Sequence, residues 1–122
     1  MAYDDIADNS DNPVQGDIFN WPNGPNCYNG DQIDYKGEEV GEENFISVLK
    51  GNKDRASGVV LETNENSTVF IFYSGAGETN GAQKMPNGSV VYPESLMDAI
   101  FEMRDKKMYK QMVIYWASDY AE

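Results

Sequence analysis

The sequence predicts an α/β fold built around a parallel β-sheet. Two apolar runs, Val69 to Tyr73 and Met112 to Ala117, are too short for helices and contain no alternating polar residues, which is typical of strands buried on both faces. Between them, Pro93 to Lys106 has the apolar spacing of an amphipathic helix. A strand, a helix and a second strand in this order predict a right-handed βαβ unit of a parallel sheet.

The 122 residues are enough for one domain, which we divide into two parts. Residues 1–41 form an acidic, loop-rich segment, and residues 42–122 hold a helix followed by the strand-helix-strand unit. Over residues 1–44, eleven Asp and Glu stand against one Lys, so most of the net charge of -12 lies in the first third. Clustered acids disfavour nucleic-acid binding, which needs clustered Lys and Arg.

Turn-forming residues fill the acidic segment. Asn12-Pro13, Pro22-Asn23-Gly24-Pro25 and Asn29-Gly30 are turn signals. Met1 to Ala7 is either the end of a strand or a frayed terminus. Aromatic residues predict that parts of the segment pack against the rest of the protein: Phe19, Trp21, Tyr28 and Tyr35.

Glu42 to Lys50 is predicted to be the first helix. Phe45, Val48 and Leu49 share one helical face. Glutamates in the first turn and a lysine in the last complement the helix macrodipole. Gly51 follows as a predicted C-cap.

The remaining elements frame the strand-helix-strand unit. Val59 to Leu61 is either a short strand or a loop anchor, and Pro86-Asn87-Gly88 is the turn of a polar loop that runs to Tyr92. Pro93 suits the first position of the second helix, where a missing N–H costs nothing. Five residues are predicted to form the apolar face of this helix: Leu96, Met97, Ile100, Phe101 and Met103.

Composition excludes several classes of site. The chain has no histidine and one cysteine, Cys27, which excludes histidine-dependent catalysis, an internal disulfide and Cys- or His-ligated metals. No apolar run is long enough to span a bilayer, and the N-terminus lacks the pattern of a signal peptide. We therefore expect no metal, no cofactor, no nucleic acid and no membrane contact.

Weak motifs have simpler interpretations. Gly75, Gly77 and Gly81 follow a strand, but a dinucleotide loop needs a helix that starts on the glycines. Four aspartates within residues 4–11 lack the glycine and closing glutamate of a calcium loop, which favours a solvated acidic loop. Cys27 has no base to activate it, so we expect a small buried hydrophobic residue.

Six stretches of the chain, taken in order and spacing, together identify a family. They are Met1 to Ala7, Asn12-Pro13, Asp34 to Gly37, Glu43 to Gly51, Val69 to Tyr73, and Lys107-Met108-Tyr109-Lys110 with the strand after it. This set resembles the legumain family of asparaginyl cysteine endopeptidases over almost the whole chain. Ser74-Gly75 is slightly more like the catalytic subunit of GPI transamidase, a relative, but Asp34 to Gly37 and Lys107 to Lys110 favour legumain.

The resemblance implies a caspase-like α/β fold, in which a parallel sheet carries helices on both faces. It also implies cysteine-type proteolysis of peptide or protein substrates, in a family that is usually lysosomal or vacuolar. The family's first strand and first helix, and its later strands, have no counterpart in this sequence. We therefore expect a fragment of the peptidase domain.

In the family, the turn after the first of the two catalytic strands reads Ser/Thr-Asp-His-Gly and supplies the histidine base and an oxyanion-hole N–H. In this chain Ala76 stands at the histidine position and Gly75 at the aspartate position, and only Gly77 matches. The resemblance therefore leaves Gly77 as a vestigial oxyanion-type residue.

The second catalytic strand of the family runs into Glu-Ala-Cys-Glu-Ser-Gly, which supplies the cysteine nucleophile. An ungapped alignment puts Asp119 at the cysteine position and Ala117 at the glutamate that helps to bind the substrate asparagine. A one-residue deletion puts Ser118 at the cysteine position instead. Neither alignment restores a nucleophile with a base, so we expect an inactive homologue without catalytic residues.

The alternative is a non-enzymatic binding protein, a decoy for legumain substrates, inhibitors or an active homologue. Its contact surface would be the acidic first third of the chain. The sequence identifies no partner protein.

Overall fold

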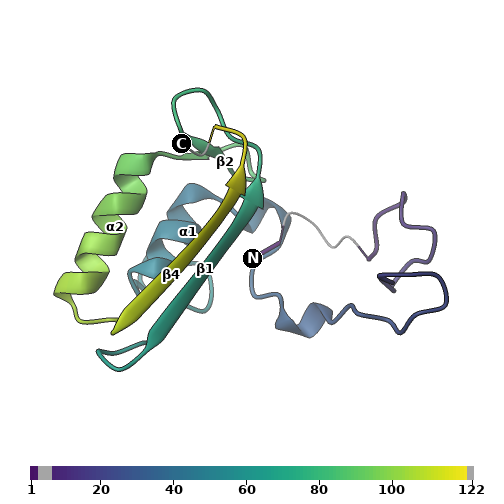
Figure 1. Ribbon diagram of the computed structural model, residues 1–122, viewed down its shortest axis with the longest axis horizontal. Coiled ribbons are helices and arrows are strands. Elements are labelled where there is room, and N and C mark those ends of the chain that lie inside the picture. The colour runs from purple at the N-terminus through teal and green to yellow at the C-terminus, as the bar shows by residue number, and fades with distance from the viewer. Residues whose placement is uncertain (3–6, 121–122) are drawn as a thin grey trace.

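The computed structural model describes residues 1–2 and 7–120. It contains two α-helices, α1 (Glu42–Leu49) and α2 (Pro93–Asp105), and two eight-residue strands, β1 (Thr68–Gly75) and β4 (Gln111–Ser118). Two short strands, β2 (Gln83–Lys84) and β3 (Val90–Val91), lie between β1 and α2, and two 3-10 turns (Gly30–Gln32 and Gly37–Glu39) precede α1. Figure 1 shows much of the segment before α1 running away from the body that these elements form, whereas the N-terminus lies beside β1.

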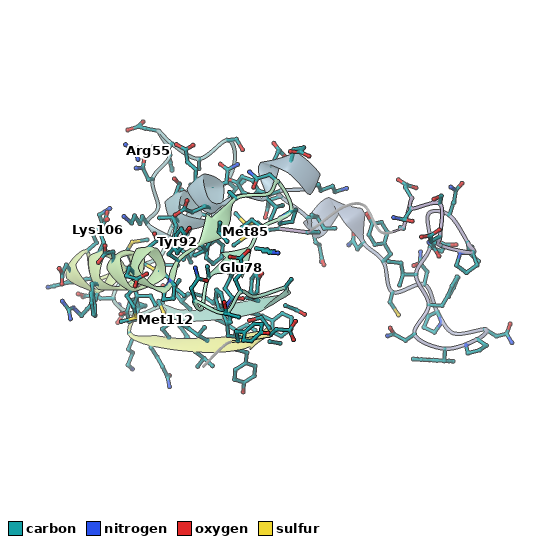
Figure 2. The ribbon with its side chains drawn as sticks, turned by 90° about the horizontal axis from the view of Figure 1, so that it is seen from above. Arg55, Glu78, Met85, Tyr92, Lys106 and Met112 are labelled. Atoms are coloured by element: carbon teal, nitrogen blue, oxygen red, sulfur yellow. The ribbon has the colours of Figure 1, made fainter. Side chains whose placement is uncertain are left out.

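β1 and β4 are adjacent parallel strands, as predicted. Their register runs from Thr68 opposite Gln111 to Gly75 opposite Ser118. α2 connects them, and both helices lie on the same side of the sheet (Figure 2). Both carboxyl ends of the long strands therefore meet at one edge of the molecule, where sites of open α/β sheets are found.

The core lies between the helices and the sheet. Ala99 and Met103 of α2 are fully buried against Val69 and Ile71 of β1, and Leu49 of α1 joins the same cluster. A second cluster packs the loops before α1 and α2 against each other through Tyr35, Val40, Met85 and Val91. The first helix ends as predicted, because Gly51 adopts a positive φ of 66° just after the Lys50 C-cap.

The expectation that β1 is buried on both faces is wrong for the described part of the chain. Burial alternates along the strand: Phe70 and Phe72 are 60% and 62% exposed, and Tyr115 of β4 is 61% exposed on the same face. Helices cover one face of the sheet, whereas the resemblance implied helices on both. The apolar composition of a strand shows that its faces are suited to burial. It does not show whether other residues of the same chain cover each face.

The apolar face of α2 is narrower than predicted. Met103 is buried, and Leu96 and Ile100 are half-buried, but Met97 and Phe101 are each 45% exposed. The helix approaches the sheet through Ala99, whose small side chain permits close contact. Phe101 faces outward instead, with the Arg104 guanidinium 5.2 Å from the centre of its ring.

The loop between β1 and α2 is more ordered than the sequence suggested. β2 and β3 pair antiparallel, Gln83 with Val91 and Lys84 with Val90. The predicted turn at Pro86-Asn87-Gly88 joins them. Before β1, Val59 to Leu61 is a loop anchor rather than a strand, because Val60 is buried and the N–H of Leu61 donates to the Val48 carbonyl at 3.1 Å.

In the acidic segment, some of the predicted packing is present and some is not. Ala2 forms a parallel bridge with Lys36, so the start of the chain is extended and paired at that residue; residues 3–6 lie outside the described part. Tyr35 packs as expected and is 2% exposed, with its hydroxyl donating to the Val59 carbonyl at 2.8 Å. Phe19 and Trp21 are 41% and 57% exposed and do not pack down.

Neither helix of the described chain has the length and apolar character that crossing a bilayer requires.

Candidate site at the carboxyl ends of β1 and β4

The turns after β1 and β4 touch each other. Gly75 and Ser118, the last residues of the two strands, are opposite in register. Gly77 then pairs with Gln83 in an antiparallel bridge and packs directly against the main chain of Asp119. A Cβ at position 77 would overlap the Asp119 carbonyl oxygen. The two stretches that the sequence singled out are therefore brought together.

Ala76 presents only a methyl group at this edge. Its side chain is exposed, and its carbonyl oxygen accepts a hydrogen bond from the Lys84 N–H at 2.9 Å. The nearby hydroxyl of Tyr73 lies 3.4 Å from the same carbonyl and donates to the Lys84 carbonyl at 2.7 Å. Burial raises the pKa of Tyr73 above its usual value of 10.0. The phenol therefore stays protonated at neutral pH and cannot act as a base.

The last two residues of β4 and the residue that follows them differ in exposure. Ser118 has its Oγ buried, with no hydrogen-bond partner within the described residues. Asp119 and Ala117 are exposed. A buried serine hydroxyl without a base is a weak nucleophile, and an ionised aspartate can only accept hydrogen bonds. Neither alignment candidate for the nucleophile is activated by a neighbour.

Other candidate groups do not complete a catalytic set. Lys84 is paired with Glu78 at 3.5 Å. Cys27 is exposed rather than buried, which corrects the sequence expectation. It lies within the acidic segment, which Figure 1 shows extending away from the sheet, and its Sγ is 3.4 Å from the Pro25 carbonyl oxygen.

The weak motifs of the sequence remain simple loops. α2 begins at Pro93, well after the glycines at 75, 77 and 81, so no helix starts on them. Within residues 1–2 and 7–120, no cluster of three His, Cys, Asp or Glu side chains could hold a metal ion. Asp4 and Asp5 of the acidic run lie outside the described residues.

Sequence reasoning missed two features beside the site. Tyr73 and Trp116 stack across the strands, with ring centres 4.5 Å apart and planes at 17°. Gln83 is only 4% exposed, and its Oε1 has no hydrogen-bond partner within the described residues. It contributes to a small cavity of about 180 Å³ beside Trp116 and Leu96. Nothing in the polar loop signalled this burial, because it depends on the β2–β3 pairing.

Comparisons with known proteins identify relatives of this chain. The sequence profile of the peptidase C13 family matches residues 1–121. Legumain of Rattus norvegicus is 40% identical over 119 residues, which are 94% of this chain and 27% of that protein. Legumain of Canavalia ensiformis is 42% identical over 118 residues, and vacuolar-processing enzyme of Citrus sinensis 40%; the matches cover 94% of this chain and 25% and 24% of those proteins.

The chain thus spans about a quarter of the length of the curated relatives it matches. The family match covers nearly every residue, and the parallel pair β1–β4 is present as predicted. This chain belongs to the peptidase C13 family, the family of legumain.

Proposed function

We propose that this chain is a non-catalytic member of the legumain family and does not cleave peptides after asparagine. The observation that carries the proposal is the composition of the two touching turns. Ala76 stands where the family resemblance places a histidine base, and the whole chain has no histidine that could replace it. The family's cysteine position falls on Asp119 or Ser118.

Peptide-bond cleavage by this family's chemistry needs a thiolate to attack and an acid to protonate the leaving amine. Ser118 keeps a neutral, buried hydroxyl, and Asp119 would repel a developing oxyanion rather than stabilise it. Tyr73 is held protonated by its raised pKa. These properties support a site that keeps the family's backbone arrangement but has lost its reactive groups.

Substrate recognition is weakened for a separate reason. Ala117 takes the position of a carboxylate that the resemblance assigns to asparagine binding, and it offers an exposed methyl group instead. A site built to hydrogen-bond a polar side chain loses much of its selectivity when that partner is removed. Binding of an asparagine side chain at this position should therefore be weak.

A second candidate function is that of a non-enzymatic binding protein. The observation that favours it is the charge of residues 1–44, which contain eleven Asp and Glu residues and one Lys. Asp8, Asp11, Glu38 and Glu39 of this segment are exposed. Such a surface suits a basic partner, and attraction to it would weaken with added salt.

Turnover of a fluorogenic Ala-Ala-Asn substrate at mildly acid pH tests the first proposal, with rat legumain as the positive control. We expect no hydrolysis above the buffer blank; clear hydrolysis by the purified chain would overturn the proposal. Adding the chain to the rat legumain reaction tests the second. If the chain is a decoy, it lowers the rate of the rat legumain reaction, and added salt reduces this effect. An unchanged rate with the chain in excess would rule out the decoy function.

A further inference from the structure

The sequence contains two acceptor patterns for N-linked glycosylation, which read Asn-x-Ser or Asn-x-Thr with x other than proline. One is Asn66-Ser67-Thr68, which runs into β1, and the other is Asn87-Gly88-Ser89, in the turn between β2 and β3. Short patterns of this kind also arise by chance. What decides between the two is whether the fold already uses each asparagine side chain.

The Asn87 side chain has a structural role. Its Oδ1 accepts hydrogen bonds from the Ser89 N–H at 3.0 Å and from the Ser89 hydroxyl at 2.6 Å. The same hydroxyl accepts from the Glu42 N–H at 2.8 Å, and so pairs one of the amides at the start of α1 that have no partner within the helix. Asn87 Nδ2 packs against the buried Gly41, where a Cβ would overlap it. Because a sugar would be attached to Nδ2, this contact leaves no room for one.

The Asn66 side chain has no such role. Asn66 is exposed in a turn ahead of β1, and its carboxamide makes no hydrogen bond within the described residues. The turn is held by Asn64, whose Oδ1 accepts from the Asn66 N–H at 2.9 Å and whose carbonyl accepts from the Ser67 N–H at 3.0 Å. The Ser67 carbonyl in turn accepts from the Lys110 N–H at 2.8 Å. The main chain of the turn is therefore fixed, while the Asn66 amide stays accessible.

We propose that Asn66 is an acceptor for N-linked oligosaccharide and that the folded chain carries none on Asn87. The donor class is an oligosaccharide joined through a diphosphate to a polyprenol lipid. In the transfer, Nδ2 of Asn66 forms a bond to C1 of the first sugar and gives up one proton. The C1–O bond to the diphosphate breaks, and the lipid diphosphate leaves with the electron pair. No group is oxidised or reduced.

The position of Asn66 keeps a glycan away from the candidate site. Asn66 precedes the first residue of β1, whereas Gly75 ends the strand at the edge where the two turns meet. A strand of eight residues spans roughly 25 Å, and Figure 1 shows its two ends at opposite ends of the body. A bulky, hydrated glycan would therefore cover an exposed turn and leave the other edge open. This inference goes beyond the loss of catalysis, and neither proposal depends on the other.

Site mapping on the folded protein tests the proposal. The full chain is secreted from eukaryotic cells behind a cleavable signal peptide, which the fusion supplies because the start of the chain lacks the pattern of one. Size exclusion isolates the folded monomer, and peptide N-glycosidase F in ¹⁸O water converts each glycosylated Asn to labelled Asp for mass spectrometry. We expect the label at position 66 and none at position 87. An unlabelled position 66, or a labelled position 87 in the folded monomer, would overturn the proposal.

Two matched variants test the acceptor pattern itself. Thr68 is exposed, so its replacement should leave the fold intact. Thr68→Ala should abolish the label at position 66, whereas Thr68→Ser keeps the hydroxyl and should retain it. Equal labelling of the two variants would contradict recognition of this pattern.

A second measurement works without a folded monomer. The same fusion is translated in a cell-free extract with endoplasmic reticulum microsomes, and gel mobility with and without endoglycosidase H reports the number of glycans. Asn66→Gln should carry one glycan fewer than wild type. Asn64→Gln is the control, because Asn64 belongs to neither acceptor pattern, and it should keep the wild-type mobility. Equal mobility of Asn66→Gln and wild type would refute the assignment.

Discussion

The Asp119 carbonyl oxygen fills the space that a Cβ of Gly77 would need. This contact joins the turn after β1 to the turn after β4. Gly77 does not have a positive φ, so space, rather than backbone conformation, excludes a larger residue there. Main-chain atoms cannot rotate away as a flexible side chain can, so a substitution must move one turn relative to the other.

We therefore predict that Gly77→Ala lowers the free energy of unfolding by about 1–3 kcal/mol, the usual range for overpacking. Urea denaturation followed by tryptophan fluorescence measures the change. Ala76→Ser is the control, because position 76 is exposed, and it should change stability by less than about 0.5 kcal/mol. Equal stability of Gly77→Ala and wild type would mean that the turns do not touch in solution.

The sequence was sufficient to predict the elements that rest on local pattern. β1, α2 and β4 were expected because two uninterrupted apolar runs flank a helical repeat that starts at a proline. The first helix was predicted within one residue, from its acidic start and Gly51 at its end. In these segments the residues that set local conformation are also the ones that pack.

Features that depend on tertiary contacts were missed. Met97 and Phe101 satisfy the helical repeat but lie outside the narrow contact made by Ala99 and Met103. The β2–β3 pairing and the burial of Gln83 arise from neighbours that a polar loop does not reveal. At the candidate site, the meeting of the two turns followed from the parallel strands, whereas the burial of the Ser118 hydroxyl did not.

The open face of the sheet gives a second prediction. Phe70 and Tyr115 make an edge-to-face contact at 5.4 Å, and both are about 60% exposed. Exposed apolar patches bind hydrophobic dyes and promote aggregation. We expect the purified chain to be marginally stable, to bind such a dye and to aggregate.

Replacing both residues, Phe70→Thr with Tyr115→Thr, should reduce dye fluorescence at least twofold. Thr retains a high strand propensity, so the strands should persist. Met103→Thr, which alters the buried core, should instead raise dye binding by loosening the packing. Unchanged dye binding in the double variant would locate the dye site elsewhere.

A third prediction concerns the link between the helices. The Glu102 carboxylate of α2 forms two ion pairs. Lys106 Nζ lies 2.6 Å from it, and Nζ of Lys50, at the end of α1, lies 2.9 Å from it. Hydrogen bonds from Lys106 and then Lys50 hold the pKa of Glu102 below its usual 4.5. A lowered pKa in the folded state means that the stabilisation is present above pH 4.5 and is lost as the pH falls through the folded-state value.

Glu102→Gln should therefore cost up to about 1 kcal/mol at pH 7, the range for exposed pairs, and the cost should shrink toward zero as the pH falls below 4.5. Urea midpoints across this pH range, with and without 0.5 M salt, measure it. Glu65→Gln, at an exposed loop position before β1, is the matched control. A difference between Glu102→Gln and wild type that persists at low pH would assign the effect to packing rather than charge.

The last prediction is that restoring the two family side chains will not restore proteolysis. The variants are Ala76→His combined with either Asp119→Cys or Ser118→Cys, which covers both alignments. A thiol introduced at position 118 would be buried, because the Ser118 Oγ is buried. A thiol introduced at position 119 would lie on an exposed turn. Ala117 would still offer no carboxylate to hold the asparagine side chain. Catalytic groups need support that fixes them within about 0.5 Å, and Gly75, which the resemblance aligns with an aspartate, offers no side chain beside position 76. We expect both double variants to hydrolyse the Ala-Ala-Asn substrate no faster than wild type, while circular dichroism shows that they remain folded.

Thiol titration with a chromogenic disulfide checks that each new cysteine is present and accessible, with Cys27→Ser as the background. Turnover in either folded variant would show that the two side chains alone account for the inactivity that we propose.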